Sequence, residues 1–175
     1  PGVASVRDLL YEEESRRVFV LDAFRGALVG VPLPEGWRET RSSALLPAGA
    51  LELHAIGPGP VRLLRAGGYL IADVLLQHAL VLFPVKHGRP DFAGERRIVH
   101  DGPIWSFDAV ERDGWLWIAA CGVEDRPLDR TKGEFGFVDS FLFLYRVPLG
   151  ATASPAWDPE LRATMNLSEL GVVTP

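Results

Sequence analysis

The sequence has 175 residues, 47% of them hydrophobic, and a formal net charge of −5. This composition is that of a globular chain long enough to bury one core, and it excludes an intrinsically disordered protein. An acidic balance without any dense basic run argues against nucleic-acid and anionic-membrane partners, and no apolar run approaches the roughly 20 residues that span a bilayer.

The first part of the chain alternates short apolar runs with turn residues. Strands are expected over 6–11, 17–22 and 27–33, with the acidic segment 12–15 as a solvated turn. The segment 38–46 alternates poorly and is typical of an outer, half-exposed strand that completes this first unit. No segment shows a helical stripe, so the predicted fold is all-β.

A second unit follows the same pattern. The segment 51–56 alternates with a period of two and leads through the rigid turn 57–60 into an apolar run at 61–64. A turn at Gly67-Gly68 precedes the next strands. These expected strands cover 69–73, 79–85 and the outer segment 96–100.

The third unit is a hairpin with a long insertion. Two apolar runs between Ile104 and Ala120 flank Asp113-Gly114, a residue pair whose tolerance of positive φ suits a tight primed turn. The segment 141–149 closes the unit, after an insertion over 122–140. The segment 161–167 resembles the outer strand of a further unit.

The three units share equivalent positions. The segments Phe19–Asp22, Leu70–Asp73 and Trp117–Ala120 are equivalent in the three units. The next strand of each unit ends around a proline, at 32, 84 or 148. A repeat of about 40 to 50 residues with about four short strands is the signature of a β-propeller blade. The alternatives are a β-sandwich or an open barrel. We therefore expect one partial propeller domain over 1–175, with units at 3–46, 50–100 and 101–167 and part of a fourth blade.

The strand endings Val20-Leu-Asp22 and Ile71-Ala-Asp73 resemble the "V-A-D" ending of NHL and YVTN-like propeller repeats, whereas Ala120 departs from it. The resemblance implies that Asp22 and Asp73 organise turns by accepting backbone N–H bonds in the loop that follows each of them. It also implies ring closure, either by the rest of a longer propeller or by another copy. A periplasmic or secreted location is slightly favoured, and a cytoplasmic one stays open.

The insertion is the most unusual stretch, with five carboxylates and three basic groups between Glu124 and Asp139. Loops of this length are commonly functional. Glu124, Asp125 and Asp129 offer oxygen ligands for a divalent metal such as Ca²⁺, although the central glycine of a calcium loop is missing. The same three residues with Arg130 form a candidate contact for a protein or small ligand. A plain salt-bridged surface loop is the third interpretation.

Aromatic residues around the hairpin give a further candidate site. Trp105, Trp115 and Trp117 alternate there and suit either an aromatic binding wall or the interlocking of adjacent sheets. We include Trp105 among the candidate ligand-binding residues.

No motif assigns catalysis. The sequence lacks a Gly-x-Ser-x-Gly elbow and a phosphate-binding glycine loop, its four histidines have no metal-ligand spacing, and the lone Cys121 follows an apolar strand and is expected to be a small buried hydrophobe. The primary hypothesis is a non-catalytic binding or scaffold module without a cofactor. One alternative is a metal-dependent hydrolase that resembles gluconolactonase-type propellers, with Asp73 and Asp108 as the carboxylates to test. Another is the propeller part of a larger redox protein.

Overall fold

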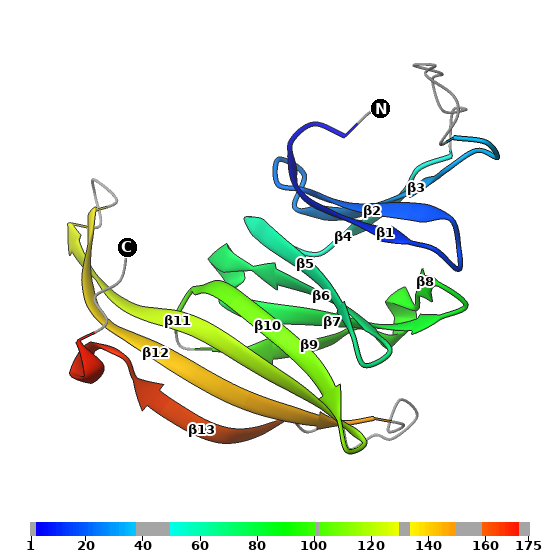
Figure 1. Cartoon of the computed structure of the whole chain (residues 1–175). Coiled ribbons are helices and arrows are strands. Elements are labelled where there is room, and N and C mark those ends of the chain that lie inside the picture. The colour runs from blue at the N-terminus through cyan, green and yellow to red at the C-terminus, as the bar shows by residue number, and fades with distance from the viewer. Residues whose placement is uncertain (1–2, 38–49, 101, 130–133, 150–158, 172–175) are drawn as a thin grey trace.

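A computed structural model describes residues 3–37, 50–100, 102–129, 134–149 and 159–171. Three antiparallel sheets follow one another along the chain, and each is built from strands that are close in sequence (Figure 1). The described secondary structure consists of strands and three short 3-10 turns, which confirms the all-β prediction. None of the described helices is long or apolar enough to span a membrane.

The first sheet has the strand order β1-β2-β3-β4. Its strands are β1 (Val6–Glu12), β2 (Arg17–Asp22), β3 (Ala27–Pro32) and β4 (Glu52–Ala55). Because β4 pairs with β3, this segment is the fourth strand of the first sheet, whereas the sequence pattern had grouped it with the second unit. The outer strand predicted over 38–46 lies outside the described residues.

The second sheet has β5, β6 and β7 in order, with β9 on the outer side of β7. A two-residue strand, β8, also pairs with the end of β7. The strands are β5 (Pro60–Ala66), β6 (Tyr69–Val74), β7 (Ala79–Lys86), β8 (Arg89–Pro90) and β9 (Arg96–Val99). Single 3-10 turns, η1 (Leu75–Gln77) and η2 (Phe92–Gly94), lie in the connections.

The third sheet is strongly curved and contains the two longest strands (Figure 1). Its strands are β10 (Ile104–Arg112), β11 (Trp115–Asp129), β12 (Glu134–Pro148) and β13 (Glu160–Asn166), followed by η4 (Ser168–Leu170). β13 pairs with β12 and is the fourth strand of this sheet, not the start of a further unit. The described residues of the insertion, 122–129 and 134–140, belong to β11 and β12 and lengthen both strands.

The hairpin at the start of the third sheet closes as predicted. Arg112 pairs with Trp115, so the turn has two residues, and Asp113 and Gly114 have φ values of 52° and 76°. Positive φ at both central positions defines a type I′ turn, whose twist matches that of the flanking strands.

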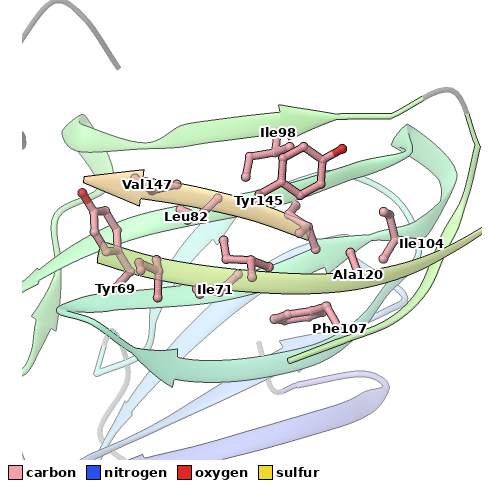
Figure 2. Packing of buried hydrophobic residues seen from close by; sticks show 12 residues of the cluster. Tyr69, Ile71, Leu82, Ile98, Ile104, Phe107, Ala120, Tyr145 and Val147 are labelled. Atoms are coloured by element: carbon pink, nitrogen blue, oxygen red, sulfur yellow. The ribbon is translucent and has the colours of Figure 1, made fainter. Parts of the chain in front are cut away.

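Two hydrophobic cores lie between successive sheets. The core between the first and second sheets contains ten buried side chains, among them Phe19, Leu21, Ala72 and Val81. The core between the second and third sheets contains twelve, including Ile71 and Leu82 from one side and Ala120 and Val147 from the other (Figure 2). Burial of this apolar area between sheet faces is the dominant favourable contribution to folding.

The first strands of the three sheets are neighbours. β5 contacts β1 on one side and β10 on the other, so these inner strands line one region while β4, β9 and β13 lie outermost (Figure 1). Sequential four-stranded sheets that pack face to face with their first strands together are propeller-like blades. The predicted class, all-β with propeller-like four-stranded sheets, is therefore confirmed, and the segment predicted as part of a fourth blade belongs to the third sheet.

Candidate functional site

The three inner strands begin at the same end of the sheets, which we call the axial end, and each carries a β-bulge near its start. The register shifts lie between Val6 and Asp8, between Pro60 and Leu63, and between Ile104 and Ser106. A bulge inserts an extra residue that is left out of the ladder and redirects side chains, and bulges are common beside functional sites. The axial end is therefore the first candidate site.

Three charged residues stand at one level of the inner strands. Asp8 pairs with Leu21 and Asp108 with Ala119, while Arg62 lies opposite Asp73. The second strand of each sheet starts at a residue paired with a proline, namely Pro32, Pro84 or Pro148. Leu21, Asp73 and Ala119 each lie four residues after that start, so the residues opposite them occupy equivalent positions. The two aspartates also share a local geometry, since each accepts a hydrogen bond from the next backbone N–H, at 2.8 Å for Asp8 and 3.0 Å for Asp108.

Polar contacts join the inner strands of all three sheets. The backbone N–H of Leu63 donates to Oδ2 of Asp8 at 2.8 Å, which links the first sheet to the second. Nη1 of Arg62 donates to Oγ of Ser106 at 3.3 Å, and its guanidinium lies 5.6 Å from the ring centroid of Phe107, which links the second sheet to the third. Arg62 is thus the central side chain of this row.

Two bulge residues are open to solvent. Arg7 is exposed and has no hydrogen bond or ion pair within the described part of the chain, and Trp105 is 56% exposed. A free guanidinium supplies a fork of N–H donors, and an exposed indole supplies a flat apolar surface with one donor. The axial end therefore offers hydrogen-bond donors, carboxylate acceptors and an aromatic face.

Two fully buried aspartates support the starts of the inner strands. Burial alone would raise the pKa of Asp22, but hydrogen bonds from the backbone of Ala4, Arg25 and Ser5 and from the Arg25 side chain outweigh it, so the pKa lies below its ordinary value. Asp22 also accepts from the N–H of Phe24, so it organises the following loop as predicted.

Asp73 differs from that prediction. Its Oδ1 accepts from the backbone N–H groups of Val61 and Arg62, in the bulge of β5, and not from the loop that follows Asp73. Burial raises the pKa of Asp73, and these two bonds offset it only in part. Its Oδ2 is buried with no hydrogen-bond partner in the described residues. Asp73 therefore holds the bulge that carries Arg62.

A two-stranded arm rises from the axial end of the third sheet. The pairing of β10 with β11 ends at Gly122, and β11 and β12 continue as a pair beyond it (Figure 1). Glu124, Asp125 and Asp129 lie on the β11 side of this arm, where the structure describes only their backbone, and Arg130 lies outside the described residues. Their predicted ligand contacts stay predictions.

A shallow cleft lies at the opposite end of the sheets. It has a volume of about 370 Å³ and lies between the β5–β6 turn at Gly67-Gly68, Lys86 of β7, Glu111 of β10 and Leu149. Because Glu111 is near the end of β10 rather than its start, this cleft is separate from the bulges.

The histidines are dispersed. His54 contacts Glu95 at 2.9 Å and stacks on Phe92, while the buried His100 contacts the Tyr145 hydroxyl at 3.0 Å. Within the described ranges, no group of three or more His, Cys, Asp or Glu side chains could hold a metal ion. Asp73 and Asp108, the carboxylates named for a hydrolase, belong to no such group there.

The predicted Trp105 lies at the axial end, whereas the other two tryptophans of the hairpin do not join it. Trp115 and Trp117 instead flank the Arg146 guanidinium, at 4.1 and 6.0 Å from its carbon to the ring centroids. Sequence reasoning missed Arg7, Asp8 and Arg62. The signal for them was the repeated Val-Arg pair at 6–7 and 61–62, each followed by a Leu-Leu pair within two residues.

Comparisons with known proteins do not add to this description. No family model matches the sequence, and neither a curated protein nor a solved structure shows significant similarity to the chain.

Proposed function

We propose that this chain is a non-catalytic, propeller-type binding module that presents its axial end to a protein segment or a small polar ligand. The observation that carries the proposal is the set of three bulges at the starts of the inner strands. They place Arg7 and Trp105 in solvent beside the row of Asp8, Arg62 and Asp108.

The chemistry of these side chains supports recognition by hydrogen bonding and stacking. Arg62 is held by Ser106 and Phe107, so its planar donor fork loses little freedom when a ligand binds. Asp8 and Asp108 supply acceptors at the same level, and the exposed indole of Trp105 supplies area with few rotatable bonds. The β11–β12 arm stands at the same end and adds a second surface for a protein partner.

The likeness to propeller repeats also implies further sheets beside the first and third, from the rest of a longer propeller or from another copy of the chain. A metal-dependent hydrolase and a larger redox protein remain alternatives from that likeness, and no observation at the described residues favours either over binding.

The proposal is tested by probing a glycan array and a random-peptide array with the fluorescently labelled chain, followed by titration of the strongest hit. We expect saturable binding that Arg62→Ala and Trp105→Ala each weaken by about tenfold or more, since both truncate central contacts. Arg112→Ala is the matched control, because Arg112 is an exposed arginine at the other end of β10.

Equal binding by the wild type and by both axial variants would place the ligand elsewhere and reject the proposed site. The absence of saturable binding on both arrays would reject the binding module itself. Titrations repeated with a chelator separate the hydrolase alternative, because only a metal-held ligand would be released.

A further inference from the structure

Each sheet has two faces, and successive sheets pack in chain order, so each face can be named by the neighbour it faces. We call the face toward the next sheet along the chain the forward face and the other the backward face. In the first core the forward face of the first sheet, with Phe19, packs on the backward face of the second, with Ala72 and Val81. In the second core Ile71 and Leu82 are on the forward face of the second sheet and pack on the third. The described sheets thus leave one forward face and one backward face without a neighbour.

The forward face of the third sheet is the first of these. Leu116, Ile118 and Ala120 point into the second core, so the alternate residues of β11, including Trp117, point to the other face. Trp117 is equivalent to Phe19 and Ile71 in the repeat, because each lies two residues after the start of its strand, where the strand pairs with a proline. Phe19 and Ile71 are 2% and 0% exposed, whereas Trp117 is only half-buried.

Apolar neighbours of Trp117 are open as well. Val110, its direct partner on β10, is 59% exposed, and Met165, on the outermost strand, is 48% exposed. Leu142 and Leu144 on β12 are half-buried. By the repeat's own geometry, this face is one that a further sheet would cover.

The backward face of the first sheet is its counterpart. Leu9, Val20, Val29 and Leu53 pair in one straight row across the four strands. Val20 and Val29 are buried with Val3 and Leu51 packed against them, but Leu9 and Leu53 at the two ends of the row are 58% and 56% exposed. In the second sheet the residue that matches Leu9 is Leu63, which is 5% exposed because the first sheet covers it.

We propose that the forward face of the third sheet binds the backward face of the first sheet in a second copy of this chain. The positions match, because Trp117 would face Val20 and Val29, which are the repeat equivalents of Ala72 and Val81 in the core that contains Phe19. The contact continues the packing that the chain already uses twice. If each copy makes this contact with the other, two identical contacts join the copies head to tail. The result is a closed ring of six sheets with twofold symmetry.

This inference rests on the propeller-like arrangement in the proposed function but uses different residues from the axial end. Failure of dimerisation therefore leaves the binding assay with Arg62→Ala and Trp105→Ala unaffected, and failure of ligand binding leaves the dimer measurable.

Sedimentation equilibrium of the purified chain tests the proposal. We expect a mass of about 38 kDa, twice the 19.2 kDa of one chain. Leu9→Asp and Val110→Asp, one on each open face, should each raise the dimer dissociation constant by about tenfold or more, because a carboxylate would be buried without a partner. Val99→Asp is the matched control, since Val99 is 70% exposed on β9 of the middle sheet.

Mixing the two variants gives the decisive result. In a head-to-tail pair of Leu9→Asp with Val110→Asp, one contact joins two unaltered faces, so the mixture should form a heterodimer that neither variant forms alone. A wild-type mass of 19.2 kDa at about 100 μM, where a micromolar interface is saturated, would overturn the proposal. So would a dimer that survives Leu9→Asp, because two forward faces would then be paired with each other. Far-UV circular dichroism of each variant confirms that loss of the dimer is not loss of folding.

Discussion

Asp22 and Asp73 end similar sequence motifs, Val20-Leu-Asp22 and Ile71-Ala-Asp73, and both are fully buried. Their pKa values nevertheless move in opposite directions. Asp22 accepts four backbone N–H bonds and one from the Arg25 guanidinium, and its pKa is lowered. Asp73 accepts two backbone N–H bonds through one oxygen, its other oxygen is unpartnered among the described residues, and its pKa is raised. The number of donors, not burial, decides which form of the carboxyl the fold prefers.

A one-residue offset causes this difference. Asp22 lies five residues after the proline-paired start of β2, whereas Asp73 lies four residues after that of β6. Since successive residues of a strand point to opposite faces, the two side chains leave their sheets on opposite sides. Asp22 holds the segment before β1 and the turn between β2 and β3, whereas Asp73 holds the bulge that positions Arg62.

The largest expected effect is that of Asp22→Ala. The substitution leaves four backbone donors and the Arg25 guanidinium without their acceptor, so we expect a loss of about 3 kcal/mol in the free energy of unfolding. Urea denaturation followed by tryptophan fluorescence measures it. Asp108→Ala removes an exposed carboxylate that, among the described residues, is bonded only to the next N–H. It is the control and should change stability by less than about 0.5 kcal/mol.

The pH dependence of Asp22→Asn sharpens the comparison. Because the folded pKa of Asp22 lies below its ordinary 3.8, its ionised form contributes stability that is present above pH 3.8 and is lost as pH falls through the folded value. The deficit of Asp22→Asn relative to wild type should therefore be constant near neutrality and shrink in acid below 3.8. A deficit that grows in acid would contradict the assignment. Denaturation at a series of pH values gives the profile.

Asp73→Asn should have the smallest effect and the opposite sign. The amide oxygen can still accept from Val61 and Arg62, while the buried charge is removed, so we expect stability within about 1 kcal/mol of wild type, on the favourable side near neutral pH. Because the folded pKa of Asp73 is raised, wild type loses stability as pH rises from 3.8 through the folded value, and the advantage of Asp73→Asn should appear over that window. A clear loss at neutral pH would show that the carboxylate is needed at the bulge.

Much of the fold follows from local sequence patterns. The alternation of apolar residues located most strands, and Asp113-Gly114 fixed the hairpin turn because few residue pairs accept two positive φ values. The division between the first two sheets was missed, since Glu52–Ala55 is separated from its partner β3 by a long connection and only the pairing itself reveals the assignment.

The candidate site was less predictable. Trp105 was found because three tryptophans alternate around the hairpin. A bulge adds one residue to a run without altering its composition, so Arg7 and Arg62 looked like ordinary strand residues. The shared ending of β2 and β6 concealed the offset between Asp22 and Asp73 for the same reason. A period-two pattern specifies faces only when the register is known.

Every sheet is built from strands that are consecutive in the chain, apart from the two-residue β8, so its hydrogen bonds join neighbouring strands. Each sheet therefore has all its strands before the next is synthesised. On the ribosome the first sheet can thus assemble before β5 to β7 are synthesised, and these strands then cover Phe19. The order of synthesis and the order of packing coincide, which keeps few unpaired strand edges in contact with other nascent chains.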